Sequence, residues 1–379
     1  MAIIFDVGFD PNIIHLVGVN NIIRFYSDTV ISDVKNAELT FPNNGSPIVK
    51  TIFQGPNNKF FYNFKELFQL LMNTNNFRDD INYSTQFVDW SHIGYRREII
   101  EIKINFVDNS FETVTLDSSW LSMYLQYYNY RYNYNIDIVK NISWVLKPKA
   151  RNIKHTFKYW VGYPFTFGLY TGDYQNLGST GELVGSGSPQ NFTGLFPVTR
   201  FVVSNGASNY ITLLYPINEM TFSFNANSTN VKFIVKKIIP TCYENRVYIK
   251  WINSFGDYDY WLFSKKPDID RQTKSLGSLE NDFNDFSQTT SPFEQIGVTG
   301  DDTLTVYDTL DSNDMVYIED LLLSPKVYLF TGLPNQVSSH LDWIEVSKKA
   351  NETQIASRKN NTLQFKLDLE MPELMTRKL

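Results

Sequence analysis

Hydrophobic and polar residues alternate along much of this chain, and this period of two is typical of half-buried β-strands. Residues 247–252 show it most clearly: the odd-numbered residues are expected to be buried and the even-numbered ones to face outward. A turn follows, in which Gly256 can adopt the positive φ of a tight reversal, and 258–263 return as a second strand. The sequence predicts an aromatic β-hairpin whose rings form the core of the domain it closes. The rings in question are Trp251, Tyr258, Tyr260, Trp261 and Phe263.

The first part of the chain, 1–145, has the pattern of a β-sandwich with one helix across it. Strands are expected at 22–26, 98–106 and 113–116, the second with isoleucines on every other position. Between them, apolar residues recur at i, i+3, i+4 and i+7 over 64–71, which indicates one face of a helix. We expect an N-terminal β-sandwich-like domain over 1–145.

A second domain is expected over 155–270. Strands at 200–203, 210–214, 220–224 and 231–235 recur about every ten residues, the spacing of an all-β sandwich. The glycine-rich segment 178–189 has no Gly-Lys-Ser/Thr sequence after it, so we expect an exposed loop rather than a phosphate-binding loop. The basic, proline-containing segment 147–154 is interpreted as an inter-domain linker, with a phosphate-binding strip as the alternative.

The last third consists of a polar segment, 271–300, expected to be an arm or linker, and a C-terminal α+β domain over 301–379. Within that domain a helix capped by Asp311 or Ser312 is expected to end at Ser324-Pro325. Residues 363–371 alternate strictly, and such a strand would offer a pairing surface to another subunit if its edge were exposed. The fold class expected for the whole chain is mainly β, with multi-domain antiparallel β-sandwiches and a few short helices.

Composition and charge narrow the possible functions. Of the 379 residues 42% are hydrophobic and 20% are charged, as in ordinary folded proteins, while aromatics reach 16%, which suits β-sheets and wet interfaces. The net charge of −6 argues against sequence-specific nucleic-acid binding. The single cysteine, Cys242, excludes an internal disulfide framework and a multi-cysteine zinc site. No run of 18 apolar residues and no signal peptide are visible, so we expect no membrane span and no ordinary secretion.

The sequence offers no set of residues for catalysis. The four histidines are far apart, and no acidic cluster has the glycine that an EF-hand loop needs at its sixth position. A glycosidase needs two carboxyl groups about 5 to 9.5 Å apart in a cleft, and the acidic clusters are equally compatible with solvated turns. We therefore expect no enzyme activity, no cofactor and no catalytic, cofactor-binding or metal-ligating residue.

Tyrosine alternates with asparagine and arginine over 127–134. A strand there would present Tyr130, Tyr132 and Tyr134 on one face. Because tyrosine has a rigid apolar body and a polar tip, this face could bind sugar rings or a protein partner. The alternative is a tyrosine-rich strand or loop with no binding role, because exposed aromatic residues are common.

Two segments carry a resemblance to a known group of proteins. Residues 248–263 resemble the Trp-Leu-Asn-x-x-Gly-Gly-aromatic signature of virion tail proteins from tailed phages of Bacteroidetes, crAss-like phages included. Residues 318–329 resemble the Leu-x-x-Ser-Pro-x-Val-Tyr-Leu element of the same proteins. The resemblance covers about 200–379, and the sequence departs from it at Asp257, where a second glycine is usual.

This resemblance implies a structural subunit of a phage tail, in a ring, hub or baseplate-like position. The implied partners are copies of the chain itself in a symmetric ring and other tail or portal-vertex proteins. The implied location is the virion tail, after synthesis in the host cytoplasm. The alternative is a host-recognition tail protein that binds or degrades host-surface glycans. A bacterial adhesin is a further option, against which the missing secretion signal argues.

Overall fold

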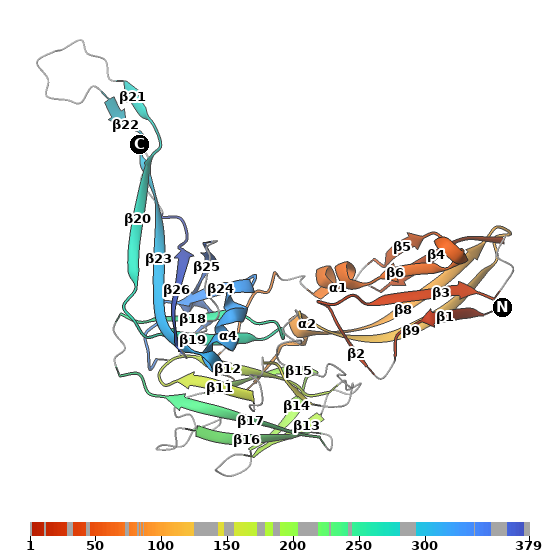
Figure 1. Ribbon diagram of the computed structural model, residues 1–379, viewed down its shortest axis with the longest axis horizontal. Helices are drawn as coiled ribbons and strands as arrows, with labels where there is room; N and C mark the ends of the chain where they lie inside the picture. Colours follow the sequence, from red (N-terminus) through yellow and green to blue (C-terminus); the bar gives the residue numbers. More distant parts are fainter. Residues whose placement is uncertain are drawn as a thin grey trace, which may run out of the picture. The chain divides into compact units, whose positions relative to one another are not determined.

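The computed structural model describes residues 2–10, 13–28, 33–42, 46–72, 76–81, 83, 85, 87–124, 143–147, 155–172, 179–184, 190–203, 219–226, 229–241, 245–280, 293–336, 338–349 and 362–374. The chain divides into two compact units. The first contains 1–159, 164–238 and 253–258, and the second contains 160–163, 239–252 and 259–379. The fold is mainly β, with antiparallel sheets and few short helices, as the sequence predicts (Figure 1). The expected domain boundaries remain predictions.

The first part of unit 1 is a sandwich of two sheets. One sheet has the order β1–β3–β6, with β1 at Ile3–Val7, β3 at Ile22–Ser27 and β6 at Phe60–Asn63. The other has the order β2–β9–β8–β4–β5, and only its β2–β9 pair is parallel. Its strands are β2 (Ile14–Leu16), β9 (Phe111–Leu121), β8 (Tyr95–Phe106), β4 (Val34–Phe41) and β5 (Ile48–Ile52).

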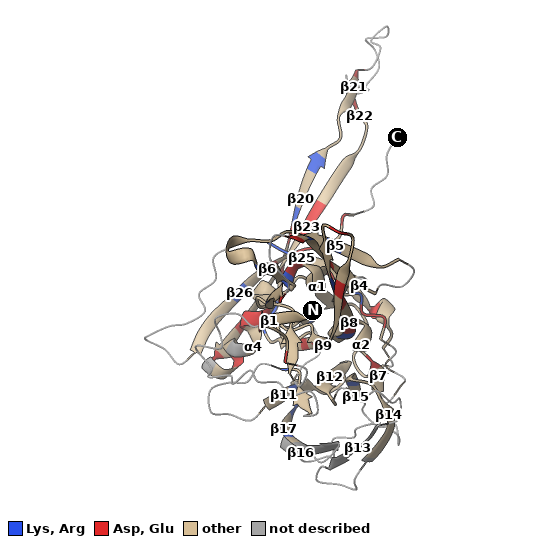
Figure 2. Ribbon diagram, turned by 90° about the vertical axis from the view of Figure 1, so that its right-hand side faces the viewer, with Lys and Arg blue, Asp and Glu red and all other residues tan. Residues whose placement is uncertain are grey.

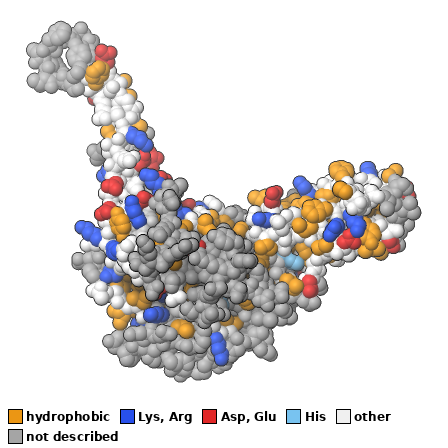
Figure 3. Space-filling model, in the orientation of Figure 1, with side chains coloured by type: hydrophobic (Ala, Val, Ile, Leu, Met, Phe, Trp, Pro, Cys, Tyr) orange, Lys and Arg blue, Asp and Glu red, His pale blue; other side chains and the backbone are white. Residues whose placement is uncertain are grey.

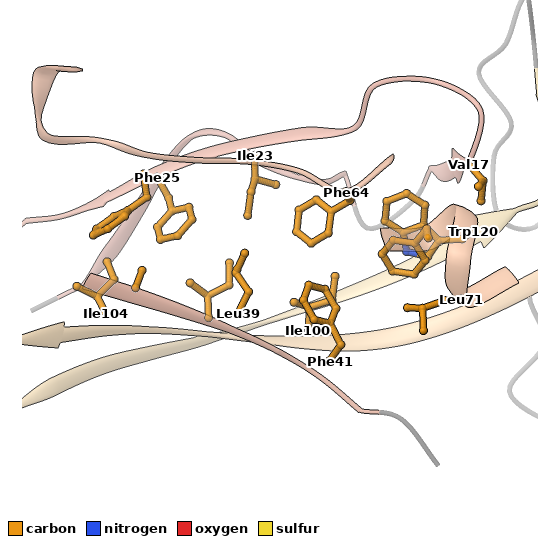
Figure 4. Close-up of a cluster of buried hydrophobic side chains, with 14 of the residues drawn as sticks. Val17, Ile23, Phe25, Leu39, Phe41, Phe64, Leu71, Ile100, Ile104 and Trp120 are labelled. Atoms are coloured by element: carbon orange, nitrogen blue, oxygen red, sulfur yellow. The ribbon is translucent and has the colours of Figure 1, made fainter. Parts of the chain in front are cut away.

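The core of this sandwich lies between the two sheets and under the helix α1 (Lys65–Met72) (Figure 4). The side chain of Asn63 accepts a hydrogen bond from the backbone N–H of Lys65 at 3.1 Å, which satisfies one free donor of the first turn. Phe68 of α1 stacks on Trp120 of β9 with ring centroids 3.6 Å apart. The alternating residues of β8 are buried as expected: Ile100, Ile102, Ile104 and Phe106.

Two further sheets complete unit 1. The first has the order β10–β12–β15–β7, with strands at Trp144–Val145, Phe165–Tyr170, Val198–Val203 and Phe87–Asp89. The second has the order β11–β17–β16–β13–β14, with strands at His155–Trp160, Thr229–Ile238, Glu219–Ala226, Ser179–Val184 and Gln190–Leu195. Phe167 of β12 contacts Phe233 of β17, with ring centroids 5.1 Å apart, so aromatic packing joins the two sheets.

One sequence expectation in this region is wrong. Residues 179–184, expected to lie in an exposed loop, form β13, which pairs with β14 on one side and β16 on the other. Gly181 is accommodated in β13 because both neighbouring strands pair with it, at Phe192 and Ala226. The rest of the expected loop, 178 and 185–189, lies outside the described residues.

Unit 2 is built on one seven-stranded sheet, with the order β19–β18–β24–β25–β26–β23–β20. These strands are Tyr258–Phe263, Val247–Ile252, Val327–Phe330, Trp343–Lys348, Thr362–Glu370, Val298–Asp311 and Asp268–Ser275. The helix α4 (Ser312–Leu323) starts as predicted: the Asp311 carboxylate accepts hydrogen bonds from the backbone N–H groups of Asn313 and Asp314, both at 2.8 Å. The short elements α2 (Ser91–Gly94), η2 (Pro56–Asn58) and η3 (His340–Asp342) complete the described fold.

One sequence expectation fails in this sheet. Every residue of β18 is buried, including Tyr248, Lys250 and Ile252, which were expected to face outward. Their face of the strand is covered within unit 2: Tyr248 contacts the ring of Tyr163 at 4.6 Å. The alternating strand β26 lies between β25 and β23; it pairs with β23 over 362–370 and with β25 only at Leu369 and Glu370.

Candidate interaction surface

A two-stranded ribbon extends from the sheet of unit 2 (Figure 1). Strand β23 pairs with β26 only over Thr303–Asp311, while 298–302 pair with β20. The ribbon continues through β21 (Ser278–Glu280) and β22 (Phe293–Gln295), since Ile296 donates its backbone N–H to the carbonyl of Gly277 at 3.0 Å. Gly277 has φ +128°, which side chains rarely adopt, so the join between the two ladders requires glycine here. We call the residues 268–280 and 293–302 the arm.

Three of the four strands of the arm are fully exposed, and 298–302 of β23 are exposed less. All residues of β20, β21 and β22 are exposed, and apolar side chains are concentrated near its far end. Leu276 is 40% exposed and Leu279 is 56% exposed. Exposed apolar side chains grouped on a projecting element indicate a contact surface for another protein. The polar segment noted in the sequence is therefore an ordered ribbon over its described residues.

Opposite charges pair across the arm (Figure 2). Arg271 of β20 donates two hydrogen bonds to the carboxylate of Asp302 on β23, at 2.7 and 2.8 Å. The hydrogen bonds from Arg271 lower the pKa of the Asp302 carboxyl below its usual range. Lys274 contacts Asp301 at 3.0 Å. Exposed ion pairs contribute little stability individually, but the fork geometry of Arg271 fixes the register of the two strands.

A second exposed apolar group lies on unit 1. Strands β5 and β6 lie side by side, and Val49, Phe53 and Phe61 on or next to them are each more than half exposed. Figure 3 shows hydrophobic side chains gathered over this part of the sandwich. These three side chains form a second exposed apolar group, in addition to the one near the end of the arm.

Metal-ligating side chains and one cavity are the features of the described residues that bear on chemistry. The described residues contain no group of three or more His, Cys, Asp or Glu side chains that could hold a metal ion. A cavity of about 570 Å³ in unit 1 has Arg78, Asp80, Trp90 and His92 among its described lining residues. Arg78 and Asp80 pair with each other at 2.8 Å. Among the helices that the structure describes, none has the length and apolar character to span a membrane.

The predicted hairpin forms, and its aromatic residues are buried, but they fall in two different compact units. Tyr258 belongs to unit 1, where its hydroxyl donates to the carbonyl of Phe77 at 2.8 Å. The other four belong to unit 2, where Trp261 donates its indole N–H to Asp308 at 2.8 Å. The tyrosines proposed as a binding face, Tyr130, Tyr132 and Tyr134, lie outside the described residues.

A buried ionic cluster in unit 1 escaped the sequence analysis. Arg200 of β15 is fully buried and contacts Asp79 at 2.7 Å and Asp257 at 3.1 Å. It also donates to the hydroxyl of Thr166 at 2.7 Å, and its guanidinium lies 4.4 Å from the ring of Trp90. The sequence signal for this cluster is an arginine within the apolar strand 198–203. A charged side chain in a buried strand needs partners of opposite charge or hydrogen-bonding groups. The partners of Arg200 are far away in sequence, so the cluster itself could not be located.

The comparisons with known proteins do not identify a family. No family model and no curated protein matches the chain. The ectodomain of the teleost fish polymeric Ig receptor has a TM-score of 0.22 at 8% identity, covering 61% of this chain and 97% of that one. The fibronectin(III)-like modules of Clostridium thermocellum CbhA have a TM-score of 0.18 at 8% identity, covering 63% and 95%. These similarities concern β-sandwich modules alone and carry no argument about function.

Proposed function

We propose that this chain is a structural subunit of a phage tail that acts through protein–protein contacts, in a ring, hub or baseplate-like position, without catalysis. The observation that carries this proposal is the arm of unit 2, a long exposed ribbon with apolar side chains near its end. The arm buries almost no apolar surface of its own chain, so it adds almost no stability to the isolated protein. Such an element is expected where it contacts another protein.

The sheet of unit 2 also supports the proposal. The two segments that resemble phage tail proteins, 248–263 and 318–329, are distant in sequence. In the structure they are neighbours: Ile249 of β18 pairs with Leu329 of β24, and Trp251 pairs with Val327. The resemblance therefore concerns one piece of sheet rather than two unrelated matches. The glycan-binding alternative rests on 127–134, and no described residue favours it.

The place of the chain in a virion can be tested on purified particles from the phage or cell that encodes it. We expect mass spectrometry to find the chain in fixed proportion to known tail proteins, and antibodies against the chain to label the tail. If the chain is absent from the particles, or labels the cell surface instead, the proposal is wrong.

The role of the arm can be tested with the variant L276S/L279S, which makes its far end polar. We expect the variant to unfold at the same urea concentration as the parent, because both side chains are exposed, but to be incorporated poorly into particles. The matched control is Leu333→Ser, which replaces an exposed leucine of unit 2 outside the arm. Normal incorporation of L276S/L279S would mean that the arm end makes no assembly contact.

A further inference from the structure

Strand β20 is an edge strand along its entire length. In the part of the chain that the structure describes, it pairs only with β23, and all eight of its residues are exposed. The outer edge of such a strand presents backbone N–H and C=O groups that another strand can pair with. Proteins usually protect long edges with charged side chains, bulges or prolines. The protection of β20 is its charges, Asp268, Asp270, Arg271 and Lys274, so a pairing strand has to match them. The register of β20 with β23 has no bulge, and β20 contains no proline.

The charges of β20 distinguish its possible partners. Residues directly opposite each other in an antiparallel pair share a face of the ribbon, so Asp270, Gln272 and Lys274 share the face that carries Asp301. Along the strand this face carries an acid, an amide and a base in turn. A strand that runs antiparallel presents the same three residues in the reverse order. A second copy of β20, running antiparallel, would therefore place Asp270 opposite Lys274 on both sides of Gln272.

We propose that the outer edge of β20 pairs antiparallel with β20 of a second copy of this chain, about a twofold axis through Gln272. This inference rests on the proposed function as an assembly protein and names one of its contacts. Two Asp270–Lys274 pairs form across the junction, and Arg271 faces Thr273 on the other side of the ribbon. The contact is isologous, since each copy contributes the same surface.

Neighbouring registers are less favourable. Moving the axis to Arg271 also gives two opposite-charge pairs, Asp268 with Lys274, but it places two arginines directly opposite each other at the centre. Moving it to Thr273 leaves no pair of opposite charges. An axis at Asp270 brings two aspartates together. Like charges directly opposite across a strand pair are destabilising, so the axis at Gln272 is selected.

The contact of Lys274 with Asp301 in its own chain is compatible with this pairing. Lys274 would lie between Asp301 of its own ribbon and Asp270 of the second copy, so the charges alternate in sign across the joined strands. An ammonium group has three donors, which is enough for both carboxylates.

The test is charge reversal, measured on the full chain by sedimentation velocity over a range of concentrations. We expect the parent to form dimers. Asp270→Lys and Lys274→Asp should each raise the dimer dissociation constant about tenfold or more, because two attractive pairs become repulsive. The double variant D270K/K274D restores opposite charges at both pairs and should recover dimerisation. An equimolar mixture of the two single variants should form heterodimers, because every pair in the mixed dimer is again of opposite sign.

Two controls separate this contact from other effects. Asp301→Asn removes the ion pair within the chain and should leave the dimer intact. Lys35→Asp makes the same charge change on an exposed position of unit 1 and should have no effect. A parent chain that stays monomeric, or single variants that associate like the parent, would overturn the pairing of β20. Assembly that persists in all variants would overturn this contact but leave the proposed function standing, whereas absence from particles contradicts the proposed function itself.

Discussion

Arg200 and Asp79 form an ion pair of 2.7 Å in which neither side chain has any exposure to solvent. Asp257 contacts the same guanidinium at 3.1 Å, so one buried cation lies between two buried carboxylates. The guanidinium also lies beside two aromatic rings, 4.4 Å from that of Trp90 and 5.0 Å from that of Tyr258. Because desolvated charges are costly without partners, unit 1 depends on this arrangement being complete.

Replacing Arg200 with methionine should therefore destabilise unit 1 strongly. The variant keeps most of the side-chain volume but leaves two buried carboxylates without their cation, which costs about 3–5 kcal/mol when one partner of a buried pair is removed. Urea unfolding measures the loss. The matched control is Arg78→Met, whose ion pair with Asp80 is exposed and should contribute about 0–1 kcal/mol. Equal stability losses for the two variants would contradict the assigned role of the buried cluster.

Gly256 should tolerate no side chain. Its φ is +79°, and a Cβ atom there would lie 2.4 Å from the carbonyl oxygen of Ser122. Gly194 has a similar φ of +73° but no atom within 4 Å of an added Cβ. Gly194→Ala should therefore cost about 1–2 kcal/mol for the backbone conformation alone, and Gly256→Ala should cost clearly more because the backbone of Ser122 must move. The urea concentrations at the unfolding midpoints of the two variants measure this difference. Equal midpoints would show that the turn at Gly256 can accommodate a methyl group.

The sequence was sufficient to locate elements whose local signals agree. The hairpin strands at 247–252 and 258–263 and the Asp311 cap of α4 are where period, turn residues and capping chemistry predict them. Local signals failed where burial is decided by distant parts of the chain. Period-two alternation assumes that one face of a strand meets water, and β18 is covered on both faces.

The pairing of the arm could not be predicted from local sequence patterns either. The polar composition of 271–300 was informative about exposure but not about strand pairing, because an exposed ribbon lacks the apolar alternation that identifies strands. Its register depends on cross-strand pairs such as Arg271 with Asp302, and a sequence does not show which distant aspartate an arginine meets. The Arg200 cluster was missed for the same reason.

Trp251 should be one of the most costly positions to truncate in unit 2. Its side chain has no exposure to solvent, and replacing a buried tryptophan with alanine costs about 3–5 kcal/mol through lost burial and the cavity left behind. Leu341 is 77% exposed, so Leu341→Ala should change stability by less than about 0.5 kcal/mol. Guanidinium unfolding followed by circular dichroism measures both, and a Trp251→Ala variant as stable as the parent would show that this ring is not a core residue.

Lys348 should make the stability of unit 2 depend on pH in the alkaline range. Its ammonium donates to the carbonyls of Leu321, Leu322 and Ser324 at the end of α4, and burial lowers its pKa from 10.5 to about 8. Between these two values the unfolded chain holds a proton that the folded chain has released, so the free energy of unfolding rises with pH. Lys348→Met removes the titrating group, so the parent should gain stability over this variant as pH increases from about 8 to 10.5. The exposed neighbour Lys349, changed to Met, is the control and should follow the parent. A constant difference between the parent and Lys348→Met across this range, measured by urea unfolding at each pH, would show that the half-buried lysine keeps its ordinary pKa.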